Sequence, residues 1–293
     1  MRFASAAGID LCYETFGDRA ARPLLLIMGL GCQLVHWPAG FCEALAQHGF
    51  WVIRYDNRDV GLSTKLEHLG LPPIPRLILR RRLGLPLRVP YQLTDLADDA
   101  LHLLDALDVR RAHVVGVSMG GMIAQLLTIR HPERVLSLCS WMSTTGDPRV
   151  GKPTNQARRV LLKTPPRELD ALLDHALVVR RAIGSHDELF DPQRAREVAA
   201  TAFKRSSYRR GFARHLAAIL AAPPREPMLE RVRAPTLVLH GRVDPLVDVS
   251  GGQATAAAIP GAELRLFDRV GHDIPEPLWP EFAAAIAKNT RRA

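Results

Sequence analysis

The sequence predicts an α/β protein built on a mostly parallel sheet, with helices on both faces and a helical insertion. Short apolar runs alternate with stretches of helical spacing, which is the order of elements in parallel sheets. Between residues 147 and 225 this alternation stops, and the pattern is helical with proline breaks. Strand-like sequence returns at residue 236. The chain has 293 residues, 47% of them hydrophobic, and is therefore long enough to bury a large core.

The first 62 residues predict an antiparallel hairpin of two strands, two further strands and one helix. The run at residues 24–27 is wholly apolar, as in a strand buried on both faces, and a glycine-rich loop follows it at residues 28–32. Gly49 is the expected end of the helix before the next strand. The expected elements are an antiparallel hairpin over residues 2–16 that turns around Ala6-Ala7-Gly8, a strand over 24–27, a helix over 41–48 and a strand over 51–56.

Residues 65–90 predict an irregular excursion on the surface. Five prolines interrupt this stretch around a short basic segment at residues 76–82. We expect no core element here.

The rest of the chain predicts two more strand and helix units on each side of the insertion. We expect a core domain formed by residues 1–145 and 233–293, and a helical cap formed by residues 146–232. The expected core elements are a helix over 94–107, a strand from 113 that leads into a helix after 118, strands over 135–141, 236–240 and 263–267, and helices over 252–258 and 278–288.

Residues 116–120 read Gly-Val-Ser-Met-Gly and stand where a buried strand changes into a helix. This strand–turn–helix context distinguishes a nucleophile turn from a chance match to G-x-S-x-G. The glycines before and after Ser118 leave room where the strand and helix backbones converge. The motif therefore predicts Ser118 as a nucleophile.

A serine hydroxyl needs a base within hydrogen-bond reach and a third group to orient that base. His272 follows the last expected strand, and Asp244 follows the strand before it. Both loops would open on the sheet edge that carries Ser118. Asp248 competes with Asp244, but a carboxylate directly past a strand end fits the orienting role better. We interpret His240 as a packing residue.

These motifs resemble the serine α/β-hydrolases, and among them the carboxylesterases and methylesterases related to aclacinomycin methylesterase. The resemblance covers about residues 8–145 and 233–290. It rests on Ile27-Met28-Gly29-Leu30-Gly31, Arg54-Tyr55-Asp56-Asn57-Arg58-Asp59-Val60-Gly61-Leu62-Ser63, the Ser118 turn, Gly241-Arg242-Val243-Asp244-Pro245 and Gly271-His272. Many members have glycine at the position of Asp59, and the sequence gives no physical reason for the aspartate.

The resemblance implies a carboxylic ester hydrolase that needs no cofactor and no metal. Ser118 would be the nucleophile, His272 the general base and acid, and Asp244 the residue that orients His272. The amides of Leu30 and Met119 would form the oxyanion hole. A small to medium apolar ester would bind in a pocket lined by Gln33, Trp37, Met142 and Leu246.

Two other uses of these residues stay open. The same triad serves carbon–carbon bond hydrolysis, thioester cleavage and cofactor-free haloperoxidase or perhydrolase chemistry. A receptor that binds a ligand without turnover is the alternative outside enzymes. The sequence leaves substrate identity open, and it leaves a monomer and a homodimer equally open.

The composition bears on partners and location. The formal net charge of +9 raises nucleic acid as a partner, but no binding motif accompanies it, so we expect none. No apolar run is long enough for stable membrane insertion. The four cysteines lack metal-ligand and disulfide spacing, and the N-terminus lacks a signal-peptide pattern. We therefore expect a cytoplasmic protein.

Overall fold

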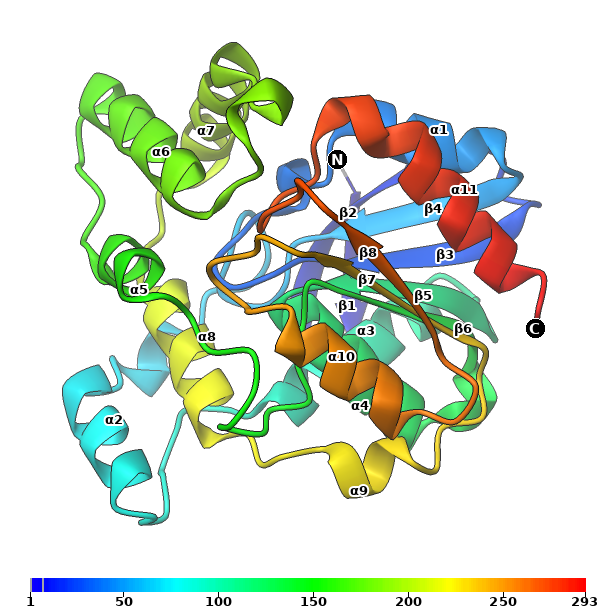
Figure 1. The fold of residues 1–293 in the computed structure, drawn as a ribbon, viewed down its shortest axis with the longest axis horizontal. Coiled ribbons are helices and arrows are strands. Elements are labelled where there is room, and N and C mark those ends of the chain that lie inside the picture. The colour runs from blue at the N-terminus through cyan, green and yellow to red at the C-terminus, as the bar shows by residue number, and fades with distance from the viewer. Residues whose placement is uncertain (1, 7) are drawn as a thin grey trace.

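A computed structural model describes residues 2–6 and 8–293. Eight strands form one sheet, shown in Figure 1 with helices on both faces. The turn expected at Ala6-Ala7-Gly8 includes residue 7, which lies outside the described residues. The strands are β1 (Arg2–Ala6), β2 (Ile9–Phe16), β3 (Arg22–Ile27), β4 (Phe50–Tyr55), β5 (Ala112–Val117), β6 (Val135–Trp141), β7 (Thr236–Gly241) and β8 (Glu263–Phe267).

The strand order is β1-β2-β4-β3-β5-β6-β7-β8. The first two pairings are antiparallel, and all pairings from β4 onward are parallel. The predicted fold class is confirmed. Because parallel strands end on the same side, the loops after β3, β5, β6, β7 and β8 meet at one edge of the sheet.

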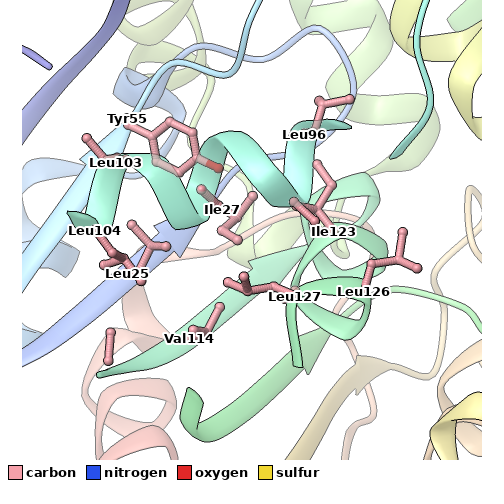
Figure 2. Packing of buried hydrophobic residues seen from close by; sticks show 14 of the residues in the cluster. Leu25, Ile27, Tyr55, Leu96, Leu103, Leu104, Val114, Ile123, Leu126 and Leu127 are labelled. Atoms are coloured by element: carbon pink, nitrogen blue, oxygen red, sulfur yellow. The ribbon is translucent and has the colours of Figure 1, made fainter. Parts of the chain in front are cut away.

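Neighbouring residues of the central strands face opposite sides of the sheet, and both sides are buried. Leu24 and Leu26 belong to the core cluster beneath α1 (Ala39–Gln47) and α11 (Trp279–Thr290). Leu25 and Ile27 belong to the cluster beneath α3 (Leu93–Ala106) and α4 (Met119–Arg130). Figure 2 shows this second cluster between the two helices and the sheet. Burial on both faces explains why the strand is an unbroken apolar run.

Five α-helices, α5 to α9, lie between β6 and β7, where the sequence predicts a cap. We call α5 to α8 the cap helices; Figure 1 shows them beside the sheet. The core–cap boundaries at residues 146 and 232 stay a prediction. None of the described helices has the length and apolarity that crossing a bilayer requires. The cap helices are α5 (Asn155–Leu162), α6 (Leu169–Ile183), α7 (Pro192–Arg205) and α8 (Arg210–Ala221). The short helix α9 (Glu226–Leu229) follows them before β7, and α10 (Ser250–Ala258) lies between β7 and β8.

The expectation of an irregular excursion at residues 65–90 is wrong in part. Residues Ile74–Arg82 form a helix, α2, which packs against α8. Pro75 occupies the first turn of α2. A proline there costs no hydrogen bond, because the first amides of a helix have no intrahelical acceptor. The prolines therefore mark the start of this helix and do not exclude it.

Candidate active site

Ser118 stands on the turn between β5 and α4 with φ 58° and ψ −119°. This left-handed backbone is unusual for a residue with a side chain and costs of order 1–3 kcal/mol. The amide of Ser118 donates to the carbonyl of Trp141 over 2.9 Å, and the hydroxyl of Ser143 donates to the carbonyl of Ser118 over 2.8 Å. Both bonds hold the turn, and the Ser118 side chain lines a cavity.

Glycine is required on both sides of Ser118 because backbones approach closely there. A Cβ on Gly116 would lie 2.1 Å from the carbonyl oxygen of Gly120. A Cβ on Gly120 would lie 2.0 Å from the carbonyl oxygen of Ile27 in β3. The spacing of the motif thus reflects contact among β5, α4 and β3.

His272 and Asp244 meet at the same edge of the sheet. The Nδ1 atom of His272 lies 2.7 Å from Oδ2 of Asp244. The other oxygen of Asp244 accepts the amides of Leu246 and Val247 over 2.8 and 2.9 Å. The carboxylate is buried, and these two donors fix its position. In the tautomer whose Nδ1–H donates to Asp244, Nε2 of His272 is the acceptor nitrogen and can act as a base.

Ser118 and His272 line the same cavity. Among the residues that the structure describes, no hydrogen bond joins the Ser118 hydroxyl to His272. Hydrogen bonds of this kind are often long in the absence of substrate and shorten when it binds.

The two competing residues have other contacts. Asp248 accepts the amide and the hydroxyl of Ser250 at the start of α10. The Nε2 atom of His240 lies 2.8 Å from the carbonyl oxygen of Val247 and 3.5 Å from Oδ2 of Asp244. Burial lowers the pKa of His240, so this imidazole is neutral and packs behind Asp244.

The loop after β3 lies against the Ser118 turn. A Cβ on Gly29 would come within 3.2 Å of the Ser118 Cβ. Within residues 2–6 and 8–293, the amides of Leu30 and Met119 donate to no protein acceptor. Met119 is the first residue of α4, where amides lack intrahelical partners and the helix dipole favours negative charge. Both amides are therefore free to bind an oxyanion.

A cavity of about 1170 Å³ lies above Ser118, between the sheet edge and the cap helices. Of the four predicted pocket residues, Gln33, Met142 and Leu246 line it. The prediction for Trp37 is wrong. Its ring is fully buried in the core, where it stacks on Phe41 with ring centroids 6.1 Å apart.

The cap holds the loop that carries His272. The amide of His272 donates to the carbonyl of Ile183 over 2.7 Å, at the end of α6. The amide and hydroxyl of Ser185 both donate to the buried carboxylate of Asp273. A Cβ on Gly271 would lie 2.1 Å from the carbonyl oxygen of Gly184, so the two backbones touch.

The cap also holds the loop that carries Leu30. Nδ1 of His215, in α8, accepts the amide of Gly31 over 3.3 Å, and Nε2 lies 2.9 Å from the carbonyl oxygen of Arg58. Burial lowers the pKa of His215 to about 4, which keeps the imidazole neutral and able to accept at Nδ1. The side-chain nitrogen Nε2 of Gln33 donates to the carbonyls of Ala202 and Ser206 in and beside α7. Gln33 thus joins the loop to the cap.

Two buried ion pairs accompany these bonds. Arg205 lies 3.0 Å from Asp56, and Arg214 lies 2.7 Å from Asp59. Asp59 has φ 67°, a conformation that glycine adopts without strain. The aspartate at this position is thus explained by its cap partner.

Four residues at the junction of cap and core were not predicted from the sequence: Arg205, Arg214, His215 and Ser185. Each is one polar residue on a half-exposed helix or its end, and no spacing connects it with the core loop that it contacts. The one available signal was the unexplained aspartate at position 59, because an aspartate that is buried needs a cationic partner.

Comparison with known proteins places this chain in a family. Residues 22–276 match the family model described as the alpha/beta hydrolase fold. The chain is 32% identical to Rhodomycin D methylesterase DauP of Streptomyces sp. (strain C5), over 97% of this chain and 96% of the relative. Rhodomycin D methylesterase DnrP of Streptomyces peucetius has the same identity and coverage.

Solved structures of hydrolases share the fold of this chain. The enol-lactonase from Burkholderia xenovorans LB400 superposes with a TM-score of 0.71 at 25% identity, covering 99% of this chain and 98% of that one. The family match and the methylesterase relatives support a hydrolase of the carboxylesterase type. The chain belongs to the alpha/beta hydrolase fold family.

Proposed function

We propose that the protein hydrolyses a carboxylic ester through an acyl-enzyme formed on Ser118, with His272 as general base and acid and Asp244 as its orienting carboxylate. The observation that carries the proposal is the 2.7 Å contact between Nδ1 of His272 and Asp244, made beside a cavity that Ser118 also lines.

The chemistry follows from these positions. Nε2 of His272 takes the proton of the Ser118 hydroxyl as its oxygen attacks the ester carbonyl. The buried charge of Asp244 stabilises the imidazolium that forms. The imidazolium then protonates the leaving alcohol, and the acyl group remains on Ser118. A water that loses its proton to His272 releases the acid and restores the enzyme.

The negative charge on the carbonyl oxygen would be met by the amides of Leu30 and Met119. Such a donor stabilises the transition state by about 2.7–4 kcal/mol. Leu30 lies on a loop that the cap holds, and Met119 lies at the start of a helix. Because both backbone amides are already in place, they need no reorganisation during the reaction, and this is why they can stabilise the transition state.

The substrate we propose is the methyl ester of a large, largely apolar acid. The cavity volume of about 1170 Å³ exceeds what a small ester fills and lies above the usual range for ligand pockets. Apolar side chains such as Met122, Met142 and Phe212 line it. The two rhodomycin D methylesterases support methanol as the leaving group. This proposal replaces the small to medium ester expected from the sequence.

Turnover of p-nitrophenyl acetate, butyrate and octanoate by the wild-type protein and by Ser118→Ala tests the nucleophile. We expect kcat to fall by roughly 10⁶-fold in Ser118→Ala. Ser207→Ala is the matched control, because Ser207 is an exposed serine lining the same cavity, and its kcat should equal that of the wild type. Equal activity of Ser118→Ala and the wild type would refute the triad.

A second panel addresses the leaving group and the alternatives. Methyl, propyl and hexyl esters of one polycyclic aromatic acid should show the highest kcat/KM for the methyl ester. Absence of turnover on every ester, with ligand-induced rises in Tm in both the wild type and Ser118→Ala, would instead indicate a receptor.

A further inference from the structure

The helix α2 stands at the margin of the molecule, away from the sheet (cyan in Figure 1). Its inner face is fixed by two residues one turn apart: Leu77 is buried, and the guanidinium of Arg81 donates to the carbonyl of Leu220 in α8. The opposite face therefore points into solvent. It carries Arg76, Leu79, Arg82 and Leu83, all exposed and at helical spacing.

Exposed leucines concentrate on this outer face and in the segments that flank α2. Leu79 is 57% exposed and Leu83 is 63% exposed. Half of the exposed large hydrophobic side chains of the described residues, five of ten, lie between residues 69 and 85. Such side chains are ordinary when scattered over a protein, but their concentration in one short segment is typical of an interaction surface. We call this group the α2 surface: Leu69, Leu71, Leu79, Leu83 and Leu85, with Arg76, Arg82 and Arg88.

The charge of the α2 surface is positive and unbalanced. Residues 68–94 contain five arginines and no aspartate or glutamate. None of the five takes part in an ion pair among the described residues. Within the cap, by comparison, three arginines (Arg194, Arg196 and Arg205) each pair with a carboxylate. Part of the basic charge outside α2 is thus neutralised by carboxylates of the protein. The arginines of α2 have no such carboxylate partner among the described residues, and they are free to bind an anion from outside the protein.

We propose that the α2 surface binds reversibly to an anionic phospholipid bilayer. The leucines would enter the boundary between headgroups and acyl chains, and the arginines would bind lipid phosphates. Mixed exposed leucine and arginine on one short helix fits this occupant, because a bilayer surface offers apolar and anionic partners together. A second copy of the same surface would bring like charges into contact. The binding is peripheral and independent of the esterase chemistry at Ser118.

Vesicle flotation with the full protein tests the proposal. The probes are vesicles of phosphatidylglycerol and phosphatidylcholine in equal amounts, and vesicles of phosphatidylcholine alone. We expect binding to the anionic vesicles that weakens as salt rises, since an arginine beside an anionic surface raises the partition coefficient about fivefold. Arg76→Gln with Arg82→Gln should lower that coefficient by roughly 25-fold. Leu79→Ser with Leu83→Ser should lower it by at least about tenfold.

Matched controls remove equivalent residues elsewhere. Val178→Ser with Leu264→Ser removes two exposed apolar side chains, and Arg110→Gln with Arg291→Gln removes two exposed charges. Both controls should bind anionic vesicles like the wild type, and all variants should keep wild-type turnover of a soluble ester. Three results would overturn the proposal: no vesicle binding, equal loss in the controls, or wild-type binding by the leucine variant. A concentration-dependent dimer lost in the leucine variant, without vesicle binding, would identify a second copy as the occupant.

Discussion

Asp244 directs both of its oxygens to fixed donors, and this is what separates it from Asp248. One oxygen accepts two loop amides, and the other faces His272. Asp248 instead bonds Ser250 at the start of α10. Four residues of separation thus place one carboxylate behind the imidazole and the other at a helix start.

Replacement of Asp244 tests this distinction. In Asp244→Asn the amide offers His272 a donor where a proton acceptor is needed, so the imidazole is held in the wrong tautomer. We expect kcat for a p-nitrophenyl ester to fall about 10⁴-fold with KM little changed. Asp248→Asn is the control and should retain wild-type kcat. A larger loss of kcat in Asp248→Asn than in Asp244→Asn would show that Asp248, and not Asp244, orients His272.

At the scale of elements, the cap forms part of the scaffold of the site. The end of α6 binds the His272 loop, and α7 and α8 bind the loop of Leu30. The side chains of Arg214 and Asp59 are fully buried at this junction. Burial opposes ionisation of Asp59, but hydrogen bonds from Arg214, the Leu66 amide and Tyr91 lower its pKa below the ordinary value. The pair is therefore ionised and binds α8 to the core.

A double-mutant cycle measures what this pair contributes. Asp59→Gly relieves the left-handed backbone but leaves the Arg214 charge buried and unpaired, so the free energy of unfolding should fall by about 3–5 kcal/mol. Adding Arg214→Met should restore most of that loss, because no buried charge remains. Urea denaturation provides the measurement.

The exposed pair of Arg242 and Asp268 is the control for this cycle. Asp268→Ala should change the free energy of unfolding by less than about 1 kcal/mol, since solvent screens the pair. A double variant no more stable than Asp59→Gly would contradict the buried-charge explanation.

At the scale of the whole molecule, one half-buried and two buried histidines link the free energy of unfolding to pH. Burial lowers the pKa of His36 and of His215 to about 4, and burial together with the charge of Arg22 does the same for His113. In the unfolded chain these groups would titrate near pH 6.5. Between about pH 6.5 and pH 4 the unfolded state binds more protons, so protonation favours unfolding in this window.

The free energy of unfolding should therefore fall as pH decreases from about 6.5 toward 4, by up to about 1.4 kcal/mol per pH unit for each buried histidine. Above pH 6.5 these groups should have no effect. Tm measured at intervals from pH 8 to pH 4.5 checks the trend. His113→Gln should flatten the slope, and His68→Gln, at an exposed position, should leave it unchanged. A slope unchanged in His113→Gln would exclude that residue as a source.

The residues that the sequence could predict are those governed by local rules. Apolar runs such as Leu24–Ile27 identify buried strands, and Gly116 and Gly120 mark the close approach around Ser118. The helix α2 was missed because its prolines were interpreted as breaks, although Pro75 falls where a helix tolerates one. Trp37 was misplaced because sequence proximity to a loop does not reveal which way a side chain points.

The sequence by itself determined the α/β architecture and the choice of Ser118, Asp244 and His272, in that chain order, as candidate site residues. The reason is that strand ends and turn motifs are patterns of residues adjacent in the sequence. The tertiary structure alone decided how the cap joins the site. The bonds of His215 to Gly31, Arg214 to Asp59 and Ser185 to Asp273 connect positions 88 to 184 residues apart. Single polar contacts over such separations leave no periodic pattern, since each depends on how whole elements pack.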